Sequence, residues 1–251
     1  MLSVLGRTRS VLGSGCGWFS LLISLLLWGN SVGLGFAQVT NLSPGQSINL
    51  SQLVGANGLS LQVGDKLFSD FGFGYIDTDA DAGNDLQSSM ILVSSLSNQV
   101  GFGLRFQLPL VAISNVVKDV ALQFSVQVVN SDDLISDAHL AFTSSVLGVA
   151  AADISENIYA NGFGIGHIAS LSVDNPGNPA VFSDSKLFSG PQVKIWVQKD
   201  ISVIAAGTGI NDRALISIVD QTFSQIPEPS TFALSVGAVV ALLFVVRRRL
   251  K

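Results

Sequence analysis

Cysteine is almost absent from this sequence of 251 residues, because Cys16 is the only one. Cys16 precedes the apolar core of the N-terminal segment, whereas a lipoprotein cleavage site would follow that core. The rest of the chain has no cysteine, which excludes disulfides, thiol nucleophiles and thiolate metal sites there. It must therefore be held together by its hydrophobic core, with or without bound ions.

Charged residues are also few, at 12% of the chain. Residues 38–226 contain seven Lys or Arg against seventeen Asp or Glu, a net charge of −10. This acidity argues against binding of nucleic acid, whose phosphates need a basic surface. It is typical of an extracellular module or of a protein that binds cations. Glu156 is the only glutamate in this part, which excludes a glutamate pair of the glycosidase type, although an aspartate pair remains open.

The sequence lacks the usual signatures of hydrolases and phosphate-binding enzymes. It has no Gly-x-Ser-x-Gly elbow and no Gly-rich phosphate loop. Its two histidines, His139 and His167, do not have metal-ligand spacing, and each is predicted to lie on a strand face. Trp196 is the only tryptophan of residues 38–226. We expect Trp196 on a strand, as a core or sheet-face residue or as a stacking platform for a sugar.

The N-terminal segment is typical of a secretory signal peptide. Arg7 and Arg9 provide the basic region, and residues 18–28 form an apolar core of eleven residues. Small residues precede a predicted cleavage between Ala37 and Gln38. An uncleaved N-terminal anchor is the alternative.

A second apolar segment lies near the C-terminus, at residues 231–246. As a helix it would be about 24 Å long, somewhat shorter than a hydrocarbon core of about 30 Å. The three arginines that follow can reach outward to the headgroups and would hold the C-terminus on the cytoplasmic side. We therefore predict a transmembrane helix, with an amphipathic or core helix as the alternative. The basic stop consists of Arg247, Arg248 and Arg249.

A short polar motif, Pro227-Glu228-Pro229, precedes that apolar segment. Neither proline has an N–H, so we expect the motif outside helices and sheet ladders, as a stiff rod that presents Glu228. Motif, apolar span and arginines in this order resemble the PEP-CTERM sorting signal of Gram-negative bacteria. The resemblance implies that the motif is recognised by an exosortase, a membrane-embedded protease.

The resemblance also implies a route and a set of partners. The chain would pass the secretion translocon, be held transiently in the lipid of the inner membrane, and be delivered to the cell surface or extracellular matrix. We expect a non-enzymatic adhesive or structural protein, with extracellular polysaccharide as a candidate partner. The alternative is an exported carbohydrate-binding module or polysaccharide hydrolase that uses an aspartate pair or Trp196.

Between the two apolar ends, the sequence predicts strands. Apolar and polar residues alternate at 120–128 and 193–203, as in half-buried antiparallel strands. An Ala-rich stretch at 146–155 instead favours a short helix. Turn residues about every ten positions indicate a single β-sandwich or jelly roll. Further strands are predicted near 47–53, 58–63, 66–76, 89–95, 102–108, 138–146, 165–173 and 214–223. The expected domains are a signal peptide at 1–37, an all-β domain at 38–225 and a sorting signal at 226–251.

One acidic cluster suggests a metal site. Asp77, Asp79 and Asp81 alternate with small residues, and Asp85 follows. Carboxylates at this spacing supply the hard oxygen ligands that Ca²⁺ prefers. However, Ser88 stands at the twelfth position, where a calcium loop has glutamate, and the flanks resemble strands. Calcium binding and a solvated acidic loop both remain open.

Overall fold

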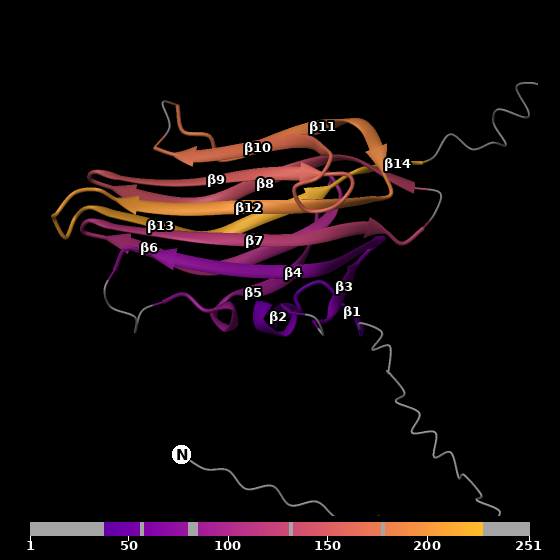
Figure 1. Ribbon diagram of the computed structural model, residues 1–251, viewed down its shortest axis with the longest axis horizontal. Helices are drawn as coiled ribbons and strands as arrows, with labels where there is room; N and C mark the ends of the chain where they lie inside the picture. The colour runs from indigo at the N-terminus through magenta and orange to yellow at the C-terminus, as the bar shows by residue number, and fades with distance from the viewer. Residues whose placement is uncertain (1–37, 56–57, 80–84, 131–132, 177–178, 228–251) are drawn as a thin grey trace, which may run out of the picture. The chain divides into compact units, whose positions relative to one another are not determined.

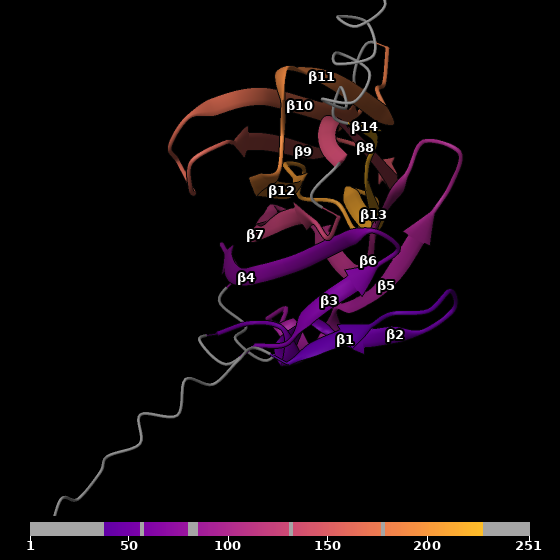
Figure 2. The ribbon, with the colours of Figure 1, turned by 90° about the vertical axis from the view of Figure 1, so that its right-hand side faces the viewer.

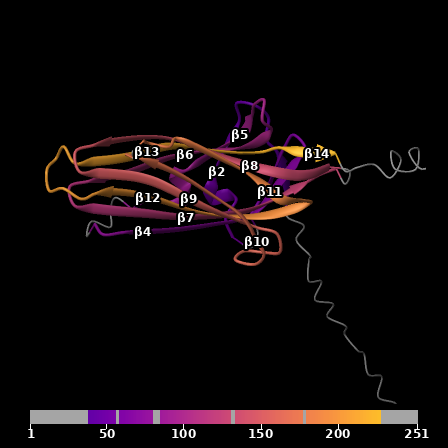
Figure 3. The ribbon, with the colours of Figure 1, turned by 90° about the horizontal axis from the view of Figure 1, so that it is seen from above.

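The computed structural model describes residues 38–55, 58–79, 85–130, 133–176 and 179–227, which confirm the all-β prediction (Figure 1). These residues form two seven-stranded sheets that lie face to face as a β-sandwich. Seen from above, the two layers run side by side along the length of the strands (Figure 3). The predicted signal peptide and residues 228–251 lie outside the described residues.

The first sheet, here called sheet A, has an order in which consecutive strands are rarely neighbours. Its only parallel pair among the described strands is β1 with β3, and all its other pairs are antiparallel. In spatial order its strands are β1 (Val39–Asn41), β3 (Ser60–Val63), β4 (Lys66–Asp77), β7 (Val116–Val128), β12 (Lys194–Ala205), β9 (Ala150–Tyr159) and β10 (His167–Asn175).

The second sheet, sheet B, is antiparallel throughout the described strands. The end-on view in Figure 2 shows β10 and β11 lying next to each other at one side of the sandwich. The strands of sheet B in spatial order are β11 (Ser183–Gln192), β8 (Asp133–Leu147), β13 (Arg213–Phe223), β6 (Phe102–Ile113), β5 (Leu92–Ser97) and β2 (Ser47–Asn49). A further short strand, β14 (Gln225–Pro227), also pairs with β8.

Strand alternation determines which side chains form the core between the sheets. In β7 the residues Val120, Leu122, Phe124, Val126 and Val128 are all buried, as the period of two predicts. Phenylalanines from both sheets meet at the centre. The Phe124 ring of sheet A lies 5.8 Å from the Phe106 ring of sheet B, measured between centroids. Such contacts stabilise the sandwich by removing large apolar surfaces from water.

The predicted helix at 146–155 is wrong. These residues form the end of β8, a turn, and most of β9. Gly148 has a φ of 67°, a left-handed conformation that suits glycine and closes the turn. Ala152 and Ile154 are buried at alternate positions, so the period of two prevails over the helix propensity of alanine.

Other element boundaries also differ from the prediction. Short 3₁₀ helices, η1 (Leu50–Gln52) and η3 (Ser88–Met90), replace parts of the strands expected at 47–53 and 89–95. The sequence pattern predicts no strand at the positions of β1, β9, β11 and β14. Pro227 was expected outside any sheet ladder, yet it is the last residue of β14 and pairs with Asp133 at the start of β8. This terminal position is one that proline tolerates.

Candidate functional site

The outer face of sheet A carries an ordered set of polar and aromatic side chains. It is formed by the side chains of β4, β7, β12, β9 and β10 that point away from the core. The strand registers align these side chains in rows that run across the sheet. The first row, here called the aromatic row, consists of Ser69, Ser125, Trp196, Tyr159 and His167.

Three rings stand next to one another in the aromatic row. Trp196 is directly opposite Tyr159, and Tyr159 is directly opposite His167. The Tyr159 and His167 rings meet edge to face, with 5.9 Å between their centroids. Trp196 and Tyr159 are half-buried and His167 is exposed, so all three rings reach solvent.

A hydrogen-bond network anchors one end of the aromatic row. The Ser125 hydroxyl donates to Asp70 Oδ2 at 2.6 Å, and Lys194 Nζ lies 3.1 Å from the same oxygen. Lys194 Nζ also lies over the Trp196 ring, 5.0 Å from its centroid, which is a cation–π geometry. Burial raises the pKa of Asp70, but hydrogen bonds from Ser125 and Lys194 outweigh it and hold that pKa below its usual value.

The position of Asp70 follows from a β-bulge. The pairing of β4 with β7 shifts between Ser69 and Gly72, and Asp70 has a φ of 57°. A bulge of this kind redirects a side chain relative to the regular alternation. Asp70 therefore reaches Ser125 and Lys194 on the outer face.

A second row, here called the amide row, lies beside the aromatic row. The register aligns Gln123 of β7, Gln198 of β12 and Asn157 of β9, followed by Ser170 of β10. Ser170 donates to Asn157 Oδ1 at 2.8 Å and is hydrogen-bonded to His167 Nε2 at 2.7 Å. Within the part of the chain that the structure describes, Gln123 and Gln198 make no side-chain hydrogen bond. Each amide therefore offers both a donor and an acceptor.

Small residues make the surface low where the amide row meets β4. Gly72, Gly74 and Ala121 border a depression of about 240 Å³ that Gln123 and Gln198 also line. A Cβ atom built on Gly72 would come within 2.6 Å of the Gln123 side chain. The two glycines thus leave room beside the amides, which we call the trough.

Carboxylates occupy the end of the outer face beyond the amide row. Asp119, Asp200, Asp153 and Asp174 come from four neighbouring strands. Burial, a hydrogen bond with Asp200 and repulsion from Asp200 raise the pKa of Asp119 to about 6. Burial and the charge of Asp200 raise the pKa of Asp153 as well. This end of the face therefore takes up protons more readily than isolated aspartates do.

The acidic cluster predicted from the sequence lies elsewhere, near the end of β4. The Asp77 carboxylate accepts a hydrogen bond from Tyr75 at 2.7 Å and faces Lys118 Nζ at 3.9 Å. Partial desolvation and then the negative charge of Asp77 raise the pKa of Asp85. Asp81 lies outside the described residues. Among the described residues no group of three His, Cys, Asp or Glu side chains could hold a metal ion, and calcium binding stays a prediction.

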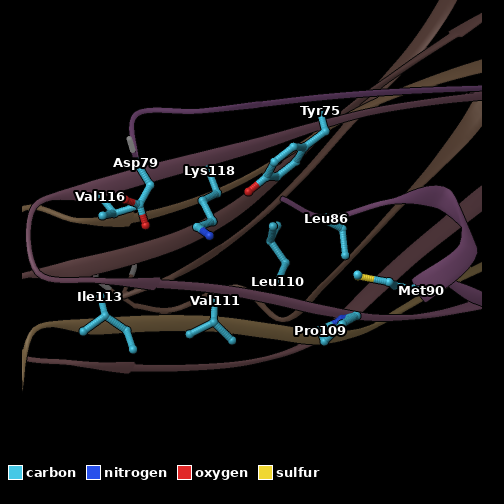
Figure 4. Close-up of a pocket in the computed structure, with 10 residues that line it drawn as sticks. All are labelled: Tyr75, Asp79, Leu86, Met90, Pro109, Leu110, Val111, Ile113, Val116 and Lys118. Atoms are coloured by element: carbon cyan, nitrogen blue, oxygen red, sulfur yellow. The ribbon is translucent and has the colours of Figure 1, made fainter. Parts of the chain in front are cut away.

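A cavity of about 300 Å³ adjoins this cluster. Figure 4 shows the Tyr75 hydroxyl and the Lys118 amino group pointing toward the same space, with Leu86 and Met90 on its other side. Burial, together with the hydrogen bond to Asp77, raises the pKa of Tyr75 well above its usual value. The Asp77 carboxylate thus already accepts a hydrogen bond from Tyr75 and pairs with the charge of Lys118.

The remaining predicted sites are described only in part. Gln38, after the predicted cleavage, is exposed, and its carbonyl accepts a hydrogen bond from the Ser60 N–H at 3.0 Å. Ala37, before the predicted cleavage, lies outside the described residues, as do these residues of the predicted sorting signal: Glu228, Pro229, Arg247, Arg248 and Arg249. In the described ranges, no helix is both long and apolar enough to span a membrane.

Of the residues on the outer face of sheet A, Trp196 and His167 stand out in the sequence, but only as separate residues. His139, on β8 of sheet B, lies away from them with Nε2 3.2 Å from Asp137. The missing signal was the pairing of β12 with β9, which brings Tyr159 next to Trp196. Asn157 and Tyr159 belong to the strand whose start was interpreted as a helix.

Comparison with known proteins shows no family for this chain. The sequence matches no protein-family model and no curated protein. Among solved structures, one of TmCBM61 with beta-1,4-galactotriose aligns with 10% identity and a TM-score of 0.31 over 62% of this chain and 90% of that one. The family 32 carbohydrate-binding module from C. perfringens NanJ, with galactose, aligns with 12% identity and a TM-score of 0.22 over 59% and 93%.

An arabinose-bound MgGH51 α-L-arabinofuranosidase aligns with 9% identity and a TM-score of 0.22, over 59% of this chain and 23% of that one. Because all three TM-scores lie below 0.5, this likeness says nothing about what the chain binds.

Proposed function

We propose that this protein binds polysaccharide outside the cell through the outer face of sheet A, and that it does so without cleaving it. The observation that carries the proposal is the aromatic row of Trp196, Tyr159 and His167 lying beside the amide row of Gln123, Gln198 and Asn157. The two rows together place aromatic rings and hydrogen-bonding groups on one partly exposed surface.

Sugar chemistry matches this combination. A pyranose ring has apolar C–H faces that pack against aromatic rings, and a rim of hydroxyls that donate and accept hydrogen bonds. Trp196 and Tyr159 provide the aromatic surface. The side-chain amides of the neighbouring row provide donors and acceptors for these hydroxyls. In small-molecule sites, a few well-placed polar groups beside aromatic side chains fix the orientation of the ligand and provide specificity.

The size of the surface favours a chain of sugars over a single one. The aromatic row crosses five strands, and strands lie about 4.8 Å apart, so the row is about 19 Å across. This distance exceeds one sugar ring. The trough beside Gly72 and Gly74 gives the glycan a low place to lie where the neighbouring amide row meets β4.

The charge of the surface favours a neutral polysaccharide. Residues 38–226 carry a net charge of −10, and four aspartates flank the amide row on the outer face. A polyanionic glycan would be repelled by these charges, and more strongly at low salt. The hydroxyls of a neutral glycan can instead donate hydrogen bonds to the carboxylates.

The geometry of the aspartates supports binding without cleavage. A retaining glycosidase holds its two carboxyl groups about 5–5.5 Å apart, and an inverting one holds them farther apart. Either pair must flank the bond that is cleaved, whereas Asp200 lies four residues from Trp196 along β12, or about 13 Å at about 3.3 Å per residue, and so away from a sugar that packs on that ring. The aspartates beyond the amide row are thus better placed to accept hydrogen bonds from sugar hydroxyls.

Export is the second half of the proposal, and it rests on the sequence resemblance. A signal peptide followed by a C-terminal Pro-Glu-Pro, apolar span and arginine cluster would carry the sandwich through the inner membrane to the cell surface or matrix. A polysaccharide-binding surface would then act as an adhesive contact with extracellular material.

An array of neutral and acidic polysaccharides tests the binding proposal. We expect the purified protein to be retained by at least one neutral glycan, with no release of reducing sugar from it. Retention by acidic glycans alone would contradict the charge argument. Release of reducing sugar that scales with protein concentration would contradict the absence of cleavage, and no retention at all would contradict the proposal as a whole.

A further inference from the structure

Three polar side chains meet, buried, in the core between the two sheets. Lys199 of β12 and Glu156 of β9 have no exposed side-chain surface, and Gln221 of β13 is fully buried. Lys199 Nζ contacts Glu156 Oε2 and lies 2.5 Å from Gln221 Oε1. Lys199 and Glu156 belong to sheet A and Gln221 to sheet B, so the cluster bridges the sandwich.

The surroundings of this cluster are apolar. In the strand registers, Lys199 is next to Leu122, Glu156 is next to Leu171, and Gln221 lies between Leu104 and Leu140. All four leucines are buried. A charged amine and a carboxylate in such a place lose their hydration, which is costly even when they are paired.

Burial favours the uncharged forms of both groups. It lowers the pKa of the Lys199 amine, against the opposing effect of Glu156. It raises the pKa of the Glu156 carboxyl, against the opposing effect of Lys199. An unprotonated amine is a nucleophile, and a protonated carboxyl is a proton donor.

Two atoms of the cluster are left without a hydrogen bond. Glu156 Oε1 and Gln221 Nε2 are buried, and neither has a hydrogen-bond partner among the described residues. Unpaired buried polar atoms are uncommon, because each costs the free energy of its desolvation. A reaction that removes the Gln221 nitrogen would remove one of them.

We propose that Lys199 and Gln221 join covalently, as an intramolecular isopeptide bond that links sheet A to sheet B. Lys199 Nζ attacks Cδ of Gln221, and a C–N bond forms. Glu156 gives its proton to the Gln221 nitrogen, which leaves as ammonia when its bond to Cδ breaks. Glu156 then takes a proton from Nζ, so it ends as it began. The atoms balance with one ammonia released, and no oxidant or co-reactant is needed.

Such a bond suits a chain that has no cysteine after Cys16. A disulfide cannot hold the two sheets together, whereas an amide can, and it does not depend on redox conditions. A second buried lysine provides a contrast. Lys66 Nζ lies 3.2 Å from Gln225 Oε1 and 3.0 Å from Asp65, but the Asp65 side chain is 26% exposed. Lys66 thus pairs with a carboxylate that water reaches, whereas Glu156 beside Lys199 has no exposed side-chain surface, so we expect no bond at Lys66.

Peptide mass spectrometry of the purified full chain tests this proposal. An acylated Lys199 is no longer a trypsin site, so residues 195–213 should stay in one piece, joined through Lys199 to the peptide that carries Gln221. The joined mass should be lower than the sum of the two peptides by one ammonia. The variant Glu156→Gln should yield separate peptides while keeping a cooperative thermal transition, and the control Lys66→Met should leave the joined pair intact.

Two results would overturn the proposal. Wild-type protein that trypsin cuts after Lys199, with both peptides at their full mass, would leave only a buried ion pair. A joined pair of Lys199 and Glu156 peptides, lower in mass by one water, would show that Glu156 and not Gln221 supplies the acyl group.

Discussion

Trp196 has the largest ring on the outer face of sheet A, and the proposed sugar contact depends on it most. Truncation to Trp196→Ala should weaken polysaccharide binding by at least about tenfold, because it removes on the order of 100 Å² of apolar contact surface. The thermal transition should change little, since the ring is only half-buried. Isothermal titration with the glycan selected on the array measures the first quantity, and calorimetry measures the second.

Phe182 offers a matched control for that substitution. It is an aromatic residue that is 49% exposed, and its ring contacts Phe142 of sheet B. Phe182→Ala should leave polysaccharide binding unchanged. Equal losses in the two variants would mean that the glycan is not held by the aromatic row.

Asp119 should make stability depend on pH in a defined direction. Its pKa is raised to about 6 in the folded protein, against an ordinary value of 3.8. Between these values the folded state binds more protons than the unfolded state, so stability falls as pH rises from about 4 to about 6. The variant Asp119→Asn removes the titrating group and should flatten this part of the profile.

Thermal melts at intervals across that pH range check the expectation. The comparison between wild type and variant isolates Asp119, since the raised pKa of Asp153 acts in the same direction in both proteins. The same downward slope in both would show that Asp119 does not hold its proton in the folded state.

At the scale of the strand, the glycines of β4 provide a test of the trough. A Cβ on Gly74 would lie 3.6 Å from the Ala121 Cβ, which is an ordinary contact, so a larger side chain fits without distorting β4. Gly74→Leu should fill the trough and weaken polysaccharide binding about tenfold while the protein stays folded. Titration calorimetry and circular dichroism measure the two effects.

Gly190 of β11 supplies the control for this substitution, because a Cβ there meets nothing within 4 Å. Gly190→Leu should bind like the wild type. Unchanged binding by Gly74→Leu would place the glycan outside the trough.

Strands with strict alternation could be predicted from the sequence, and the others could not. β7 and β12 show the pattern clearly because their inner faces are almost entirely apolar. β9 was missed because alanine favours helices, and its inner face is interrupted by the buried Glu156. Lys199 lies in the inward phase of β12, where the alternation at 193–203 predicts an apolar residue, so the sequence pattern did not indicate its burial.

The candidate site could not be predicted from local sequence patterns, because it depends on which strands pair. Trp196 and His167 were visible as single residues, whereas their alignment through Tyr159 requires the pairing of β12 with β9 and of β9 with β10. Pairing partners far apart in sequence are selected by the packing of the whole sandwich. The outward direction of the Asp70 side chain likewise follows from a β-bulge that no sequence motif predicts.

At the scale of the whole molecule, the C-terminal segment should decide where the sandwich goes. A chain that ends at Pro227 keeps every described strand, including β14. We expect this truncated protein to lose its place at the cell surface and to appear in the soluble periplasmic fraction. Cell fractionation with immunodetection measures the distribution.

A variant with Arg247, Arg248 and Arg249 changed to alanine separates the roles within that segment. This variant should still be inserted in the inner membrane but should be poorly retained there, since only the basic stop is lost. If the chain that ends at Pro227 reached the surface as efficiently as the full chain, residues 228–251 would not be a sorting signal.

The most direct test of the binding surface is to map where a bound glycan protects the protein. Oxidative footprinting of the full chain, with and without a saturating oligosaccharide, reports the accessibility of individual aromatic side chains. The account predicts that Trp196 and Tyr159 on the outer face of sheet A become protected, while Phe182 is oxidised equally in both samples. Protection at Phe182 with no change at Trp196 and Tyr159 would contradict it.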